Sequence, residues 1–575
     1  MQHFYIITIP FSTDFFQISG IDSLLSHFAF DLSLFSFDCK SDRFYKLIMT
    51  SDLHRKMGTR IGVVSGFTFL SRLAGLLRDI VTAYFFGASG TADAFYLAFR
   101  IPNLFRRLTG EGALTIAFVP VFTDYLKRSN DEAKKTASVV FTYLSIFLLI
   151  ISISGVLLAP YIVRLIAYGF EKERFELAVR LTRIMFPYIF LISLTAFCMG
   201  ILNSLKHFAA PAASPILLNI AIIFGAVFLS KFFAEPTFGL AFGVIIGGIL
   251  QLALQVPPLV HHNMLPRINV DYRHPALKSI LFMMVPAAFG AAVYQVNVLV
   301  TTFLASFLPK GSISYLWYAD RLNEFPLGIF AIAVATVTLT SLSDHVTDGD
   351  MEAFKKTFRF GLETAFSITI PASVGLVTLA EPIVATIFRR GNFSHYDAVM
   401  TGGVLSLITL GLPFVGGSRN ITPAFFAMKD TKTPVKMAAV SVVVNALFAP
   451  FLMRLFGVRG LALSLVASNL ANFLCLFCSL RMKIGKLGGS NIVRSLMRTL
   501  FASGVMACVI LICKTYLFQN LLLSNSRLIG IGVISFLILA GGVSYILALF
   551  LIGAPEAETI VSLVRRRGLG MPPKG

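Results

Sequence analysis

Residues 137–160 read ASVVFTYLSIFLLIISISGVLLAP, a run without a single charged side chain. An α-helix needs about 20 predominantly apolar residues to cross the hydrocarbon core of a bilayer. Runs of this kind recur from residue 60 to residue 553. Because backbone N–H and C=O groups find no water inside lipid, such runs form helices rather than open strands. The sequence therefore predicts an all-α polytopic membrane protein.

Composition supports this fold class and excludes others. Of the 575 residues, 56% are hydrophobic and 14% charged, whereas a soluble domain carries about 25% charged residues. The net charge of +20 arises from Lys and Arg residues that lie mainly in alternate loops rather than in one basic domain. This distribution follows the positive-inside rule and excludes a nucleic-acid-binding protein.

Apolar runs, read against Pro, Gly and charged residues, predict about fourteen transmembrane helices. They are expected at 60–86, 91–124, 137–160, 181–204, 211–233, 237–260, 276–308, 312–343, 358–380, 398–426, 434–456, 459–480, 495–518 and 527–553. Basic loops such as 127–135 and 481–486 predict that both termini are cytoplasmic. Arg389 and Arg390, in a predicted outside loop, fit this orientation least well.

An internal repeat organises these spans. Phe186-Pro187-Tyr188 and Asn219 recur as Leu412-Pro413-Phe414 and Asn445, in each case 226 residues later. The repeat predicts two six-helix lobes as parallel pseudo-repeats plus two C-terminal helices, an arrangement typical of alternating-access transporters.

This organisation predicts five segments. Residues 1–56 have neither a spanning run nor a signal-peptide pattern, and we expect a disordered extension or a mis-assigned start, with Met57 the natural first residue. The other segments are the N-lobe (57–262), the C-lobe (263–482), the last two spans (483–555) and a basic cytoplasmic tail (556–575).

Charged residues inside the first span point to a polar cavity. Each charge at the bilayer centre costs about 2.5–3.5 kcal/mol, so Arg72, Arg78 and Asp79 must face protein or water. At about 100° per residue, Arg72 and Asp79 fall about 20° apart on one helix face. Gly75 lies on the same face, where it permits close approach of a helix or ligand.

The second and eighth spans carry similar residues. Pro102 interrupts the second span beside polar residues, and Arg321 and Glu324 are i, i+3 neighbours in the eighth. The relevant residues of the second span are Asp93, Tyr96, Arg100, Asn103, Arg106 and Arg107.

Two interpretations of these charges remain open. In the first, the charges form structural pairs, namely Arg72 with Asp79, Arg100 with Asp93 and Arg321 with Glu324. In the second, the surplus arginines bind an anion such as pyrophosphate, whose geometry suits the guanidinium fork. Arg106 and Arg107 also fit a cytoplasmic rim.

The second lobe has fewer charged residues. Gln295 and Asn297 favour helix–helix hydrogen bonds over a coupling-ion site, and Arg419 and Glu363 are its other polar groups.

Enzyme and cofactor signatures are absent from the sequence. It contains no G-x-S-x-G, H-E-x-x-H or G-x-x-x-x-G-K-[ST] motif. Cys475 and Cys478 form C-x-x-C inside an apolar helix, where buried thiols are favoured over a metal or redox site. We therefore expect a transporter with no catalytic residue, cofactor or bound metal.

Several motifs resemble the N-terminal signature and later motifs of the MurJ/MviN lipid II flippases, from about Met57 to the last span. These motifs are Gly75-Leu76-Leu77-Arg78-Asp79, Thr91-Ala92-Asp93-Ala94-Phe95, Ile101-Pro102-Asn103-Leu104-Phe105-Arg106-Arg107, Glu111-Gly112-Ala113, Tyr318-Ala319-Asp320-Arg321-Leu322-Asn323-Glu324-Phe325-Pro326 and Lys432-Thr433-Pro434-Val435-Lys436.

The resemblance implies a member of the multidrug/oligosaccharidyl-lipid/polysaccharide exporter superfamily, with a cationic cavity between the lobes and a lipid-tail groove at 483–555. It implies substrate contacts for Arg72, Arg78, Asn103, Arg106 and Arg321, and gating or charge balance for Asp79, Asp93 and Glu324.

The implied substrate is lipid II, a polyprenyl-pyrophosphate-linked disaccharide-pentapeptide used in peptidoglycan and cell-shape synthesis. It would move from the cytoplasmic to the outer leaflet of a bacterial inner membrane by alternating access. Membrane lipids and cell-wall synthases are the implied partners. The alternatives are an exporter of another polyprenyl-linked sugar, or a membrane-embedded transferase, which would need a large outside loop bearing carboxylates or a metal.

Overall fold

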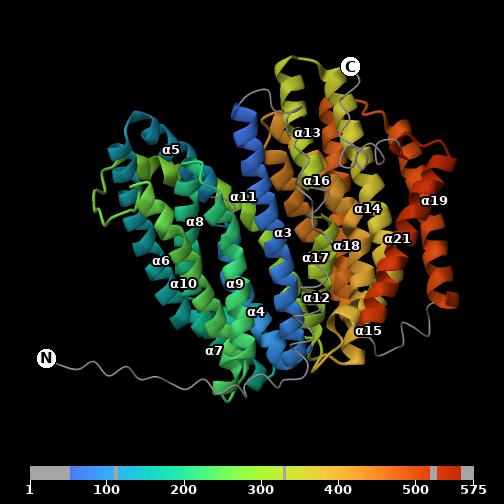
Figure 1. The fold of residues 1–575 in the computed structure, drawn as a ribbon, viewed down its shortest axis with the longest axis horizontal. Coiled ribbons are helices and arrows are strands. Elements are labelled where there is room, and N and C mark those ends of the chain that lie inside the picture. Colours follow the sequence, from blue (N-terminus) through green and yellow to red (C-terminus); the bar gives the residue numbers. More distant parts are fainter. Residues whose placement is uncertain (1–51, 109–113, 328–331, 518–526, 558–575) are drawn as a thin grey trace. The chain divides into compact units, whose positions relative to one another are not determined.

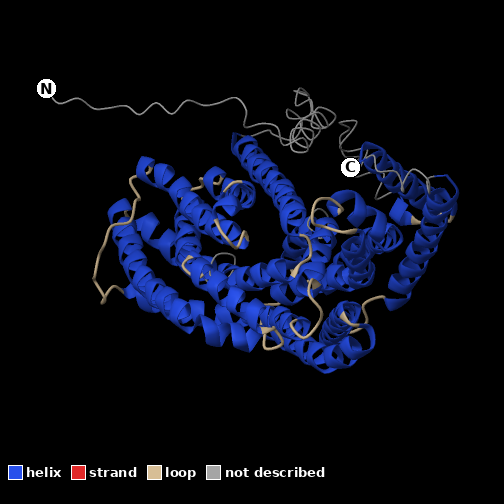
Figure 2. Ribbon diagram, turned by 90° about the horizontal axis from the view of Figure 1, so that it is seen from below, coloured by secondary structure: helices blue, strands red, loops and turns tan. Residues whose placement is uncertain are grey.

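The computed structural model describes residues 52–108, 114–327, 332–517 and 527–557. Residues 60–563 form one compact unit, to which the following description applies. Within its described residues every regular element is a helix, which confirms the all-α fold class (Figure 2). Ten helical segments there are long and apolar enough to cross a membrane.

The predicted spans coincide with helices or helix pairs. The first half of the chain contains α3 (Asp52–Phe86), α4 (Gly90–Leu108), α5 (Leu114–Arg128), α6 (Asn130–Ile166), α7 (Lys172–Met185), α8 (Tyr188–Ser204), α9 (Ala209–Val227), η4 (Leu229–Phe232) and α10 (Thr237–His261). The second half contains α11 (Pro275–Ala305), α12 (Ser312–Pro326), α13 (Ile332–Thr347), α14 (Met351–Phe388), α15 (His395–Ile408), η6 (Thr409–Gly411), α16 (Leu412–Ala427), α17 (Lys432–Phe456), α18 (Val458–Ile484), α19 (Gly489–Ile512), η7 (Cys513–Leu517) and α21 (Arg527–Leu551).

The same predicted spans are divided in both halves. The second and eighth spans become α4/α5 and α12/α13, and the fourth and tenth become α7/α8 and α15/α16. Pro187 precedes α8 and Pro413 lies in the first turn of α16, where a residue without an N–H group costs no helical hydrogen bond. The matching breaks support the internal repeat.

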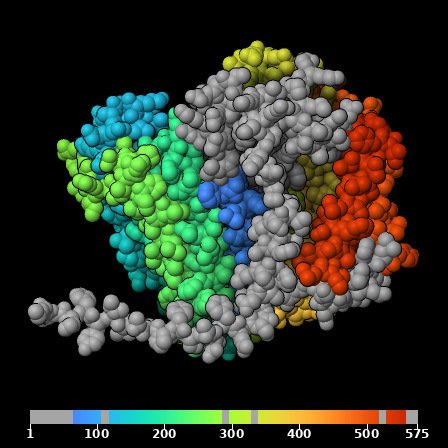
Figure 3. All heavy atoms as spheres, viewed as in Figure 1, coloured from blue at the N-terminus to red at the C-terminus, as the bar shows by residue number. Residues whose placement is uncertain are grey.

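The helices gather into two groups. Helices α4 to α10 lie on one side of α3 and α13 to α21 on the other (Figure 1). In the space-filling view, residues around 200–260 and those of α19 and α21 occupy opposite flanks (Figure 3). Helix α11 contacts both groups, because Ala276 and Ile280 pack in a core with Phe118 and Phe197, whereas Asn297 contacts α17 and α18.

The two halves of the chain meet at one end of the bundle, here called the closed end, where residues 84–93 contact residues 310–318 and 391–392. The backbone N–H of Asn392 donates to Tyr84 (2.9 Å), and its side-chain amide donates to Phe85 (2.6 Å). Gly87 has φ +60°, and a Cβ there would overlap the carbonyl of Asn392. Such backbone-to-backbone approach is open only to glycine.

Candidate anion-binding cavity

A cavity of about 1050 Å³ begins where the closed end stops. It is lined from both groups of helices, including α3, α4, α9, α12, α14, α19 and α21. Five of the predicted site residues line it, namely Arg72, Arg78, Asn103, Arg321 and Glu324. Most of the remaining lining is apolar, so the polar side chains form one region of a larger apolar chamber. That combination suits an amphipathic ligand with a compact charged group.

Asp79 joins α3 to α12 at the cavity wall. Its Oδ1 accepts from Nε and Nη2 of Arg78 at 3.0 and 2.7 Å, and its Oδ2 accepts from Nε of Arg321 at 3.1 Å. The Asp79 side chain is 1% exposed, so one buried carboxylate lies between a cation from α3 and a cation from α12. A buried carboxylate needs at least one such partner, because an unpaired charge away from water is costly.

This arrangement bears on the pairings that the sequence left open. Asp79 pairs with Arg78 and Arg321, whereas Arg72, its candidate partner in one of the two interpretations, lines the cavity and is half-buried. Arg321 does pair with Glu324, through Nη1 and Oε2 at 3.2 Å. The three described arginines of the cavity exceed its two acids, so the surplus of positive charge persists after pairing.

Arg78 has a second partner that sequence reasoning missed. Its Nη1 donates to Oδ1 of Asn219 on α9 at 3.1 Å, and Asn219 also lines the cavity. A Cβ at Gly75 would lie 3.7 Å from this amide, which is an ordinary van der Waals contact, so the approach of α9 to α3 does not require the glycine expected to permit it. In the sequence Asn219 appeared only as a marker of the repeat.

Trp317 lies beside the same charges. Its ring stacks on Tyr96 with centroids 4.7 Å apart, and Arg100 and Arg321 approach it at 5.8 and 5.5 Å. Its indole N–H points to Oδ1 of Asp79 at 3.5 Å. An aromatic face against two guanidinium groups contributes cation–π attraction and keeps both in place.

Asp93 is a buried contact across the closed end. Its Oδ1 accepts from the backbone N–H of Ser314 (2.8 Å) and from the Ser314 hydroxyl (2.7 Å), and its Oδ2 accepts from the N–H of Gly311 (2.7 Å). Asp93 thus caps the N-terminus of α12, whose terminal N–H groups have no partner within the helix. We call these bonds the Asp93 latch.

The cation that lies against Asp93 is Arg174 of α7, with Nη1 3.8 Å from Oδ2, whereas one of the two interpretations of the sequence had paired Asp93 with Arg100. Arg100 instead donates a hydrogen bond to Thr302. Arg174 is buried, and its guanidinium lies over the ring of Phe170. It was missed because it belongs to the charged stretch 171–176, which reads as an exposed loop.

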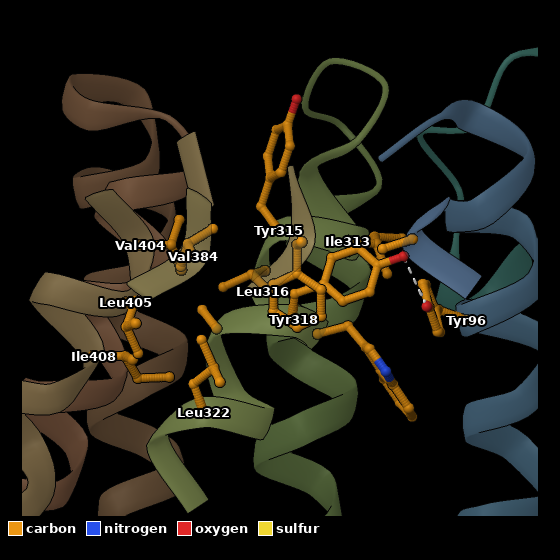
Figure 4. Packing of buried hydrophobic residues seen from close by; sticks show 14 of the residues in the cluster. Tyr96, Ile313, Tyr315, Leu316, Tyr318, Leu322, Val384, Val404, Leu405 and Ile408 are labelled. Carbon is orange, nitrogen blue, oxygen red and sulfur yellow. Dashed lines mark hydrogen bonds between the residues drawn. The ribbon is translucent and has the colours of Figure 1, made fainter. Parts of the chain in front are cut away.

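Tyrosines complete the closed end. The hydroxyl of Tyr96 donates to that of Tyr318 (3.0 Å), which donates to the carbonyl of Gly87 (3.1 Å). Figure 4 shows the side chains of α12 between Tyr96 on one side and Val384, Val404, Leu405 and Ile408 on the other. Helix α12 is therefore wedged between α4 and the α14–α15 pair.

The remaining predicted residues are placed as follows. Arg106 and Arg107 belong to α4, but their side chains lie outside the described residues, as do Glu111 to Ala113. Asn297 takes part in hydrogen bonds with Asn445 and Ser468, as the preference for helix–helix bonding predicted. On α18, Cys475 is half-buried and Cys478 is exposed, so the expectation of two buried thiols was wrong.

The chain is similar to several known proteins. The family model "Lipid II flippase MurJ" matches residues 82–531. The chain is 40% identical to "Lipid II flippase MurJ" of Burkholderia cenocepacia over 73% of this chain and 83% of that one. It is 41% identical to "Probable lipid II flippase MurJ" of Buchnera aphidicola over 72% and 81%.

Solved structures give the same result. "Lipid II flippase MurJ, inward closed conformation" matches with a TM-score of 0.72 and 30% identity, covering 85% of this chain and 98% of that one. An inward-facing multidrug resistance MATE transporter matches with a TM-score of 0.62 over 74% of this chain and 98% of that one. At 15% identity the second match concerns the fold alone.

Proposed function

This chain belongs to the lipid II flippase MurJ family, and from that premise we propose that it carries lipid II from the cytoplasmic to the outer leaflet of a bacterial inner membrane. The proteins it resembles are named as flippases, which are transporters rather than enzymes. An exporter of a different sugar lipid and a membrane-embedded transferase are both disfavoured by this membership.

One observation carries the mechanism, namely the sharing of Asp79 by Arg78 and Arg321. Arg78 comes from α3 and Arg321 from α12, so the carboxylate now holds together two cations that belong to opposite lobes. A pyrophosphate offers several oxygens to the same guanidinium forks. On entering the cavity it displaces Asp79 from one or both arginines, and the bond between the lobes passes from protein to substrate.

The head group and the tail have different environments. Arg72, Arg78, Asn103 and Arg321 bind the pyrophosphate and its sugar, and Arg106 joins them. The apolar lining from α14, α19 and α21 includes Met506, Ile510 and Ile538, and it receives the start of the polyprenyl chain. This assigns the lipid-tail groove to residues 483–555, with the lobes at 57–262 and 263–482.

The closed end faces outward in this proposal. Because successive spans alternate in direction from the closed end, the helix ends that carry Lys127, Lys135 and Lys483 belong to the opposite end, and positive loops remain cytoplasmic. Both termini are then cytoplasmic, and the cavity is loaded from the inside. Transport requires the hydrogen bonds of the Asp93 latch to break, so Asp93 acts in gating. Glu324 balances the charge of Arg321, and the substrate pyrophosphate takes the place of Asp79 beside the arginines.

Reconstitution tests the proposal. Purified protein in liposomes that contain fluorescent lipid II is assayed by access of an impermeant quencher to the head group. We expect transfer by the parent protein and loss of transfer for Arg321→Ala at equal protein content. A polyprenyl monophosphate sugar is the substrate control. No transfer of lipid II, or equal transfer of both lipids, would refute the assignment.

A further inference from the structure

Asn219 is bound at both ends of its side-chain amide. The oxygen accepts from Nη1 of Arg78 (3.1 Å), and the nitrogen donates to the backbone carbonyl of Ser71 (3.3 Å). A guanidinium only donates and a carbonyl only accepts, so the chemistry of the two partners fixes which way the amide points. Asn219 is 7% exposed, and it is therefore a rigid support beside the cavity.

The anchor of Asn219 lies on the same helix as the residue it holds. Ser71 and Arg78 are both in α3, two turns apart, so the amide spans this length of α3 from α9. Arg78 uses Nε and Nη2 for Asp79 and Nη1 for Asn219. Within the described part of the chain these bonds leave two of its five N–H groups for a ligand.

The repeat offers an internal comparison. Asn445 on α17 is the counterpart of Asn219 and contacts α11 as Asn219 contacts α3, through Asn297 and Thr301. Its partners are neutral, and its oxygen accepts from the Ser464 hydroxyl at 2.9 Å. The same residue thus joins two helices in the C-lobe, whereas in the N-lobe it also holds a cation.

We propose that Asn219 is a positioning residue for the substrate anion, which it serves by holding the Arg78 guanidinium at the cavity wall when Asp79 is displaced. This inference rests on the proposed function. A long, flexible side chain that loses its acidic partner would spread over many rotamers. With Nη1 still fixed by Asn219, the remaining N–H groups stay directed toward the pyrophosphate. Asparagine suits this role because aspartate would compete with the substrate and leucine would release the arginine.

The experiment measures binding of fluorescent lipid II to detergent-solubilised protein. Asn219→Leu should raise the dissociation constant about tenfold, which corresponds to about 1.4 kcal/mol. Asn219→Asp keeps the acceptor for Arg78, but it loses the donor to the Ser71 carbonyl and adds a charge that competes with the substrate, so it should weaken binding at least as much.

A double-mutant cycle with Arg78→Ala separates positioning from folding. Because Asn219 acts through Arg78, Asn219→Leu should change binding less than twofold in the Arg78→Ala background. Asn445→Leu is the matched control, and its effect should be the same with and without Arg78. Additive effects of Asn219→Leu and Arg78→Ala would overturn the inference, as would unchanged affinity of the single variant. If the parent protein bound no lipid II, the proposed function would fail instead.

Discussion

The Asp93 latch should hold the closed end together, and the substitution Asp93→Asn tests how strongly it does so. Asp93→Asn keeps the side-chain shape but replaces a charged acceptor of three hydrogen bonds with a neutral amide, and it leaves the buried Arg174 without its anion. Hydrogen bonds to a charged group contribute about 1.5–3 kcal/mol each, and an N-cap about 1 kcal/mol. Since the amide retains part of this bonding, we expect a loss of about 2–4 kcal/mol.

That loss applies only to the state in which the closed end is closed. It should therefore shift the equilibrium between closed and open ends by a factor of roughly 30 to 1000. Spin labels at positions 171 and 310 can measure the shift by pulsed electron paramagnetic resonance. Glu171 and Lys310 form an exposed ion pair (3.4 Å) across the same end, and such exposed pairs contribute little, so labelling should disturb the equilibrium little.

The parent protein should give one short distance, and Asp93→Asn should add a longer population. Asp397→Asn is the matched control, because Asp397 also caps a helix and accepts from Tyr315 (2.9 Å), but both belong to the C-lobe. It should lower thermal stability without changing the distances. An unchanged distribution for Asp93→Asn would show that the latch does not hold the lobes together.

Three further predictions concern the cavity and the end of the bundle opposite the closed end. Arg321→Ala should abolish complementation of a flippase-depleted strain at normal membrane abundance, with Arg321→Lys partly active because Lys keeps the charge without the fork; an abundant and active Ala variant would contradict the cationic cavity. Lys483 and Thr433 hold the pKa of Asp430 below its ordinary value, so Asp430→Asn should lower the melting temperature at neutral pH. This difference in melting temperature should shrink as the pH falls below about 3.9, because the carboxylate is then protonated in the unfolded chain. A difference that persists in acid would point to packing instead. A cysteine at position 130, on a background without native cysteines, should resist an impermeant thiol reagent applied to whole cells, and labelling there would reverse the orientation.

The fold was predictable because the bilayer imposes a single length scale on every span. Runs such as 137–160 locate their helices to within several residues at each end. The breaks before Tyr188 and Leu412 were visible as a repeated motif but not as helix ends, because an apolar run continues through both. Because hydropathy does not change at these points, only the prolines Pro187 and Pro413 mark where one helix ends and the next begins.

The sequence predicted several polar residues that line the cavity but not how their charges pair. Burial cost alone identifies Arg72, Arg78 and Arg321 as residues that need a polar environment. Helix angles suggested Arg72 as a candidate partner of Asp79 because they describe where side chains start, whereas a flexible arginine next in sequence can fold back onto the same carboxylate. The latch at Asp93 depends on a helix more than 200 residues away, and no local pattern specifies that contact.

Trp317 is the single tryptophan of the chain. It belongs to α12, yet its ring stacks on Tyr96 of the opposite lobe and its N–H points to the buried Asp79. Separation of the lobes would remove Tyr96 from the indole ring, and displacement of Asp79 by an anion would change the electrostatic field at the indole. The intrinsic fluorescence of the unlabelled protein should therefore report on lobe separation, and stopped-flow mixing with substrate can measure its rate.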